Sequence, residues 1–358
     1  MKWELYSVSD FDLFKTQWEA LNSKHLKSSL FDIRCVLPLL KYFASNKEVI
    51  AVLTHDDSVQ GIVVLEKLGR GQWQTFQPSQ SPLGFNLINP EYFNEKTIAL
   101  LTSALPGLVT SIGFTQLDPQ HYKRPEESTH CRTLDYITTG KLSVPEDFDG
   151  YWSERSRNVK QNYNRARNRL AKQDISIEFK VLTKKDDVIE GVGIYGDIES
   201  SSWKAESGTA VSRENVQGQF YRDLISGFAP DNVEVWQYLY NDEVVATDLC
   251  IKNSREMIIL KTTFVDEWNK YSPAFSMHID GIQHLVDSSI DTIEFYGPAM
   301  DWHKKLTGDL RTMYHLTWYS YPVLLNVKSA INKLKDNRFI NRKKNSDIAV
   351  KKEASVGE

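Results

Sequence analysis

The chain has 358 residues, and its 43 Lys and Arg residues against 47 Asp and Glu residues give a formal net charge of −4. At roughly 100–200 residues per domain, this length predicts two domains. A hydrophobic fraction of 41% with 11% aromatic residues is enough for packed cores and excludes a disordered chain. The near-neutral total argues against a surface coated in positive charge for nucleic acid.

The compartment is predicted from features that the sequence lacks. The three cysteines, Cys35, Cys131 and Cys250, are far apart and form no CxxC pair, which argues against a disulfide framework and against zinc binding. The histidines form no metal-ligand pattern, so we expect no metal. The N-terminus has no apolar segment with a cleavage site, and no apolar run approaches the roughly 20 residues of a membrane span. These patterns predict a cytoplasmic protein with at most peripheral membrane contact.

The first half of the chain predicts a strand, two helices, three strands, a helix and two further strands. Helices are recognised by apolar side chains at steps of three and four, as at Phe14, Trp18 and Leu21, and strands by short apolar runs between turn residues. The predicted ranges are 3–8, 11–24, 34–44, 49–54, 61–68, 72–77, 95–104, 110–117 and 134–138.

The second half repeats this order, with one more short helix before its last strand. The predicted ranges are 175–182, 186–200, 213–227, 233–240, 244–252, 257–265, 273–287, 292–296, 300–306 and 312–319. The three central strands of this half are joined by short polar connectors, which indicates an antiparallel meander. The repeated order predicts two related α/β domains.

Two basic segments separate and follow these domains. The helix predicted over 152–170 has Glu154 as its only acid between positions 154 and 172, and residues 328–358 contain nine basic and four acidic residues. We therefore predict an N-terminal domain, a basic linking helix, a C-terminal domain, and a last helix with a basic tail. Their predicted bounds are 1–145, 146–174, 175–322 and 323–358. The basic helix could contact phosphates or could be a solvated face.

Ser272 and Pro273 mark the start of the longest helix in the second half. Serine suits an N-cap and proline the first helical position, and a helix N-terminus offers free N–H groups to a phosphate. A well-capped helix without a ligand is the alternative reading of this motif.

Two loops could carry chemistry. Glu199, Trp203 and Lys204 lie in a small, polar segment that could present an aromatic ring and a cation to a ligand, or could be a surface loop. Asp301, His303 and Lys304 follow a Gly-Pro turn at a strand end, where ligands of α/β sheets usually bind. His303 could then act as a general base and Lys304 as a charge stabiliser, or the helix could be simply solvated.

The element order and these motifs resemble the GNAT superfamily of acetyltransferases. The likeness is to the BioF2-like or CelD-like branch, which is related to the Fem-type peptidoglycan aminoacyltransferases with two GNAT-like domains in tandem. It rests on the Glu…Trp-Lys…Gly-Thr-Ala segment 199–210, on Tyr271-Ser272-Pro273, and on Glu294-Phe295 followed by His303-Lys304. In three places the sequence departs from the branch pattern: Ala274 stands for glycine, Glu294 for aspartate and His303 for tyrosine.

The resemblance implies two tandem GNAT-like domains, each a mixed, mostly antiparallel sheet flanked by helices. It also implies direct acyl transfer from acetyl-CoA or another acyl-CoA to an amine or hydroxyl of a small molecule, glycan or glycolipid in envelope polysaccharide biosynthesis. In this fold the donor thioester lies where two central strands splay apart, here 257–265 and 292–296. The pyrophosphate then lies on the N-terminus of the following helix. Direct transfer needs no enzyme nucleophile.

The resemblance assigns a role to each candidate residue. The donor is assigned to Phe264, Val265, Ser272, Ala274, Phe275 and Ser276. The acceptor is assigned to Glu199, Trp203 and Lys204. The chemistry is assigned to Tyr296, as proton donor at a strand end, and to Asp301, His303 and Lys304.

Two alternatives remain open. A Fem-like transferase would use aminoacyl-tRNA, and the basic helix would contact the RNA; tRNA is the one nucleic acid that we consider. A non-catalytic binding module would keep the fold without the cosubstrate, and Ala274 in place of glycine is the feature that favours it.

Overall fold

The computed structural model describes residues 1–201 and 210–323. Its strands are β1 (Lys2–Ser7), β2 (Val49–His55), β3 (Ser58–Gly69), β4 (Gln72–Thr75), β5 (Asn86–Ile88), β6 (Ser111–Leu117), β7 (Cys131–Ser143), β8 (Ile177–Leu182), β9 (Val233–Tyr240), β10 (Glu243–Lys252), β11 (Glu256–Phe264), β12 (Thr292–Glu294) and β13 (Asp309–Tyr319). The predicted Trp203 and Lys204, and the predicted C-terminal helix and tail beyond Val323, lie outside the described residues.

The helices follow the predicted order. They are α1 (Lys15–Leu21), α2 (Ile33–Phe43), α3 (Glu95–Ala104), α4 (Phe148–Glu154), α5 (Arg157–Ala171), α6 (Lys185–Ser201), α7 (Val216–Phe228), α8 (Pro273–Leu285) and α9 (Asp301–Leu306). One difference is that the helix predicted over 152–170 is interrupted between α4 and α5. Arg155 is extended there, with ψ 146°, and the Ser156 hydroxyl accepts a hydrogen bond from the Val159 N–H, which starts a new helix.

The described strands form one continuous sheet that runs through both halves of the chain. Its order is β1-β2-β3-β4-β6-β13-β7-β12-β11-β10-β9-β8, and β5 pairs with β3. Two pairs are parallel, β4 with β6 and β11 with β12, and the others are antiparallel. Each half therefore has a mixed, mostly antiparallel sheet, as the sequence predicts.

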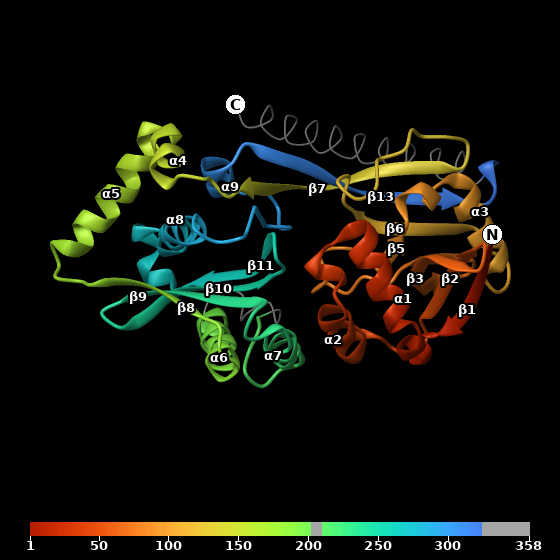
Figure 1. The fold of residues 1–358 in the computed structure, drawn as a ribbon, viewed down its shortest axis with the longest axis horizontal. Helices are drawn as coiled ribbons and strands as arrows, with labels where there is room; N and C mark the ends of the chain where they lie inside the picture. The colour runs from red at the N-terminus through yellow and green to blue at the C-terminus, as the bar shows by residue number, and fades with distance from the viewer. Residues whose placement is uncertain (202–209, 324–358) are drawn as a thin grey trace, which may run out of the picture.

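The two halves exchange their last strands. β7 ends the first half, but Lys141–Ser143 of β7 pair with β12 of the second half. β13 ends the second half, but it pairs with β6 of the first half and runs antiparallel along β7 (Figure 1). Each half-sheet is thus completed by a strand from the other half. The predicted domain boundaries, 1–145 and 175–322, divide the chain in sequence order. The exchanged strands pair across these boundaries, which stay a prediction.

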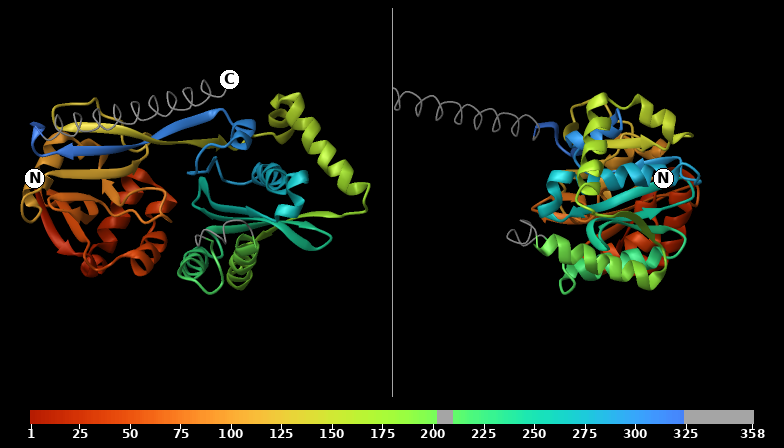
Figure 2. Two further views of the ribbon diagram at one scale, coloured as in Figure 1. Left: turned by 180° about the vertical axis from the view of Figure 1, so that it is seen from behind. Right: turned by 90° about the vertical axis from the view of Figure 1, so that its left-hand side faces the viewer.

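Helices cover both faces of the sheet in the second half. Figures 1 and 2 show α8 on one face and the pair α6 and α7 on the other. Buried apolar side chains of α6 and α7, such as Tyr195 and Phe220, belong to the same core as those of the first half. Phe220 of α7 packs edge-on against Phe43 of α2, with ring centroids 5.1 Å apart. The halves therefore touch through helices as well as through the exchanged strands.

Candidate functional site

The strands β11 and β12 are neighbours over a short distance only. They pair in parallel at three positions, from Glu256 opposite Thr292 to Ile258 opposite Glu294. β12 then ends, while β11 continues to Phe264, so the two strands separate. A cavity of about 380 Å³ lies beside this free part of β11. It is lined by Thr262, Thr263, Phe264, Asp266, Asn269, Ser272, Pro273, Ala274, Phe275, His278 and Trp302.

The N-terminus of α8 forms one wall of this cavity. Pro273 is its first residue and Ser272 its N-cap, as predicted from the sequence. Ser272 has a left-handed backbone, with φ 51° and ψ 57°, and its side chain makes no capping hydrogen bond. The N–H groups of Ala274 and Phe275 belong to the first turn, where a helix supplies no partner. The positive end of a 13-residue helix is therefore directed at the cavity without a side-chain cap.

Four of the six residues assigned to the donor line the cavity, namely Phe264, Ser272, Ala274 and Phe275. Val265 and Ser276 are not among the described lining residues, and Ser276 is buried beneath the first turn of α8. Their roles stay predictions.

A buried Asp-His pair lies at the same cavity, and the sequence analysis missed it. Asp248 of β10 and His278 of α8 are 0% and 2% exposed, and Asp248 Oδ2 lies 2.7 Å from His278 Nε2. The other polar atoms, Asp248 Oδ1 and His278 Nδ1, have no hydrogen-bond partner among the described residues. The Trp302 ring stacks on the imidazole with centroids 4.6 Å apart and planes at 13°. A carboxylate in an apolar strand segment, between Thr247 and Leu249, is the sequence signal that could have revealed the pair.

The residues assigned to the chemistry on α9 do not line the cavity. Asp301 is exposed and pairs with Lys304 at 3.5 Å. His303 is buried, and its Nδ1 accepts a hydrogen bond from the Met300 N–H at 2.9 Å. Burial lowers the pKa of His303 to about 4. Their neighbour Trp302, which the sequence analysis did not single out, is the α9 residue that reaches the cavity.

Tyr296 lies in a different environment, where the two halves exchange strands. Its backbone is left-handed, with φ 47°, and its ring lies 5.2 Å from the Arg311 guanidinium. Burial, followed by nearby carboxylates, raises the pKa of Tyr296 well above its ordinary value. It is not among the described residues that line the cavity. Its proposed role as a proton donor stays a prediction.

Glu199 holds the end of α6 to the chain that follows. It is 1% exposed, accepts a hydrogen bond from the Tyr195 hydroxyl at 2.9 Å, and accepts another from the Val211 N–H at 2.7 Å. The second bond connects α6 to Val211. The predicted contact of Glu199 with an acceptor stays a prediction.

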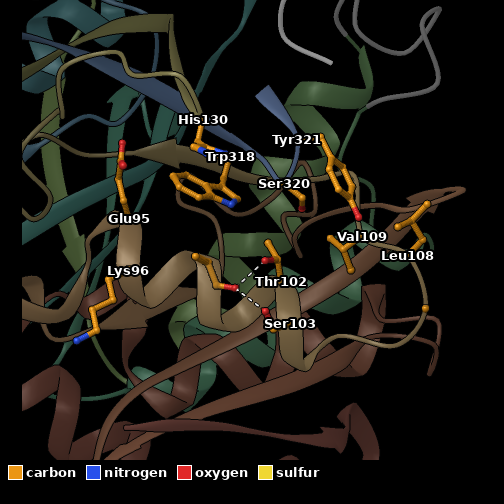
Figure 3. A pocket seen from close by; sticks show the side chains of 12 residues that line it. Glu95, Lys96, Thr102, Ser103, Leu108, Val109, His130, Trp318, Ser320 and Tyr321 are labelled. Carbon is orange, nitrogen blue, oxygen red and sulfur yellow. Dashed lines mark hydrogen bonds between the residues drawn. The ribbon is translucent and has the colours of Figure 1, made fainter. Parts of the chain in front are cut away.

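A second hollow, of about 600 Å³, lies between α3 and the end of β13 (Figure 3). One side is α3, and the other includes Trp318 near the end of β13 with His130 stacked on its ring, centroids 4.8 Å apart. Residues of this hollow do not contribute to the cavity beside β11.

Among the described residues, no three His, Cys, Asp or Glu side chains are grouped so that they could hold a metal ion. Within 1–201 and 210–323, no helix combines the length and the apolar character needed to cross a bilayer.

The part of the chain that contains the cavity is similar to a known protein family. Residues 157–304 match the family model described as an acetyltransferase (GNAT) domain. This part of the chain is similar to a GNAT domain. The match runs from α5 through β11 and α8 into α9, so it includes the strand gap and the cavity. No curated protein matches the sequence.

Solved structures share the fold at low sequence identity. The crystal structure of FemX is 10% identical, with a TM-score of 0.51, and the match covers 90% of this chain and 99% of that one. A tandem GNAT protein from the clavulanic acid biosynthesis pathway is 10% identical, with 89% and 99% covered and a TM-score of 0.47. L-PGS from Bacillus licheniformis is 9% identical, with 85% and 91% covered and a TM-score of 0.46. The large mixed sheet flanked by helices confirms the predicted α/β fold class, and FemX shares this fold.

Proposed function

We propose that the chain is an acyl-CoA-dependent N- or O-acyltransferase whose donor occupies the cavity beside β11. The observation that carries this proposal is the uncapped N-terminus of α8, which lines a cavity at the strand gap of the region similar to a GNAT domain. Pyrophosphate is the anion that such a helix start would bind through the N–H groups of Ala274 and Phe275. Lys305, whose Nζ is 6.0 Å from the Phe275 ring, adds positive charge nearby.

The rest of the cavity suits the other end of the donor. Its volume of about 380 Å³ falls within the usual range of ligand sites. Phe264, Phe275 and Trp302 provide apolar walls for a pantetheine arm and an acyl chain, while Thr262 and Asn269 provide polar groups. An acceptor amine or hydroxyl would attack the thioester carbonyl directly, and coenzyme A would leave as the thiol.

We further propose that the acceptor is a glycan or glycolipid of envelope polysaccharide, because the motifs around Glu199 and Ser272 resemble those of the BioF2-like or CelD-like branch. A cytoplasmic location fits the free thiols of Cys35, Cys131 and Cys250, all of which are buried. Acetyl transfer to a panel of hexosamines and lipid-linked sugars, followed by mass spectrometry, would test the acceptor class.

Donor binding is tested by calorimetry with acetyl-CoA and succinyl-CoA on the wild-type chain and on Ala274→Asp. An aspartate at the second position of α8 is compatible with the helix dipole, so the fold is retained, yet its charge opposes a bound pyrophosphate. We expect the variant to bind at least about tenfold more weakly, which corresponds to about 1.4 kcal/mol.

The matched control for this test is Asn158→Asp. Asn158 is exposed and is the second residue of α5, as Ala274 is of α8. Asn158→Asp therefore adds the same negative charge to the start of another helix. We expect the acetyl-CoA affinity of Asn158→Asp to equal that of the wild type. The absence of a binding signal with either acyl-CoA in the wild type would contradict the proposal.

One observation favours a Fem-like use of aminoacyl-tRNA as the second candidate. Arg157, Arg165 and Arg169 are exposed on α5, where they could contact phosphates. Arg167, in contrast, is committed to the protein, because its Nη1 lies 3.2 Å from Asp280 Oδ2 and 3.0 Å from the Tyr163 hydroxyl. The RNA-facing side of α5 in this candidate therefore excludes Arg167.

A further inference from the structure

We infer that His278 is the general base of the transfer reaction and that Asp248 positions it. This inference rests on the proposed function, since it assigns a proton acceptor to the same cavity. Neither residue belongs to the motifs by which the GNAT resemblance was drawn.

The pair is costly unless it serves a ligand. Burying a carboxylate costs free energy unless hydrogen bonds compensate it, and a buried acceptor without a partner is unfavourable. Here the Asp248 carboxylate is fully buried with the His278 imidazole as its hydrogen-bond partner, and both Asp248 Oδ1 and His278 Nδ1 have no partner among the described residues. His278 lines the cavity, so a bound substrate can supply the missing hydrogen bond.

The hydrogen bond to Asp248 selects the tautomer that a base needs. A carboxylate only accepts, so Nε2 carries the proton and donates to Asp248 Oδ2. Nδ1 then holds a free lone pair. Trp302 covers a face of the ring and keeps its plane fixed, and Nδ1 is buried without a partner among the described residues.

The charged and titratable groups around His278 come from three elements. Asp248 approaches from β10 and His303 from α9, and Asp266 lines the same cavity from the loop after β11. His303 is neutral near pH 7, because burial holds its pKa at about 4. Asp248 is the group that hydrogen-bonds to the imidazole and holds its orientation.

The reaction balances with these groups. The acceptor nitrogen or oxygen forms a bond to the thioester carbonyl carbon, and its proton moves to His278 Nδ1. The carbon–sulfur bond then breaks, and the imidazolium returns the proton to the departing thiolate. The products are the acylated acceptor and coenzyme A as the free thiol, with His278 restored to its neutral state.

The test measures thiol release from acetyl-CoA, with water and with glucosamine as acceptors, as a function of pH. The variants are His278→Gln and Asp248→Asn. We expect His278→Gln to release thiol about 10²- to 10⁴-fold more slowly and to lose the pH dependence of the wild-type rate. We expect Asp248→Asn to be about 10- to 100-fold slower, since the base is no longer oriented. Both should bind acetyl-CoA with the affinity of the wild type.

His284→Gln is the matched control, because His284 lies on the same helix, is exposed, and pairs with Glu234 at 3.3 Å rather than lining the cavity. It should keep the wild-type rate and pH profile. The inference would be overturned if His278→Gln kept the rate and the pH profile of the wild type. It would also be overturned if the wild type bound acetyl-CoA but released no thiol with either acceptor. Failure of the wild type to bind acetyl-CoA would instead contradict the proposed function.

Discussion

Arg311 donates hydrogen bonds to both carboxylate oxygens of Asp118, with donor–acceptor distances of 2.6 to 3.1 Å. Arg311 lies on β13 and Asp118 directly follows β6. The Arg311 guanidinium also lies 2.8 Å from Glu294 at the end of β12. This side chain therefore joins strands of both halves at the point where they exchange. Burial opposes ionisation of Asp118, but Arg311 outweighs it and holds the pKa of Asp118 below its ordinary value.

Replacing Arg311 should weaken this junction. Arg311→Lys cannot bond both oxygens of Asp118 and reach Glu294, so we expect the free energy of unfolding to fall by about 1–3 kcal/mol. The loss should shrink as the pH falls below about 4, because Asp118 contributes stability only while it is ionised. Urea unfolding checks both expectations. Arg124→Lys, which alters the exposed pair with Asp135, is the control and should change stability by less than about 1 kcal/mol. If Arg311→Lys were no less stable than Arg124→Lys, Arg311 would not stabilise the junction.

Glu256 should make the protein less stable at alkaline pH. Burial, followed by the negative charge of Glu294, raises the pKa of Glu256 to about 7. The folded state then holds the proton more tightly than the unfolded state, so its contribution is complete below about pH 4.3 and is lost as the pH rises through 7. We expect Glu256→Gln to have a higher Tm than the wild type at pH 8 and a similar Tm at pH 5. If the difference in Tm between Glu256→Gln and the wild type were the same at pH 5 and pH 8, the raised pKa of Glu256 would be contradicted.

Gly281 allows α8 to approach the sheet. A Cβ at this position would lie 2.3 Å from a carbon of the Trp236 ring, which is fully buried and donates to Glu234 at 2.7 Å. We expect Gly281→Ala to lower the free energy of unfolding by about 1–3 kcal/mol, because neither group can move easily. At Gly227 in α7 such a Cβ would lie 4.0 Å from its nearest neighbour, the Cβ of Arg34. Gly227→Ala should therefore leave stability unchanged or raise it by up to about 1 kcal/mol. Thermal unfolding compares the two variants, and equal Tm values would rule out the close approach.

The exposed arginines of α5 separate the two candidate functions. We expect the double variant Arg165→Glu and Arg169→Glu to bind acetyl-CoA as the wild type does, with Arg167 kept to preserve the contact with Asp280. Bulk tRNA should bind no more tightly to the wild type than to the variant. A Fem-like transferase would instead lose tRNA affinity, and its dependence on log[salt] would become shallower by about 0.9 for each phosphate contact removed. Filter binding at several salt concentrations distinguishes these outcomes.

Much of the local structure could be predicted from the sequence, because helix and strand periods depend on neighbouring residues. The repeated element order and the start of α8 at Pro273 follow from patterns within a few residues, whereas the separation of strands 257–265 and 292–296 was expected from the GNAT resemblance. The interruption at Ser156 was missed, because a cap within a long amphipathic pattern competes with a continuous helix.

The sequence by itself determined the α/β class, the two-fold repeat of elements and the helix start that lines the cavity. Only the tertiary structure decided which strands complete each half, since β13 and β6 are separated by almost the whole second half of the chain. It also decided that Tyr296 is buried beside Arg311 and that His303 is bonded to its own helix start. Asp248 and His278 meet across 30 positions. Such a pairing depends on how α8 packs on the sheet, which no local pattern of residues specifies.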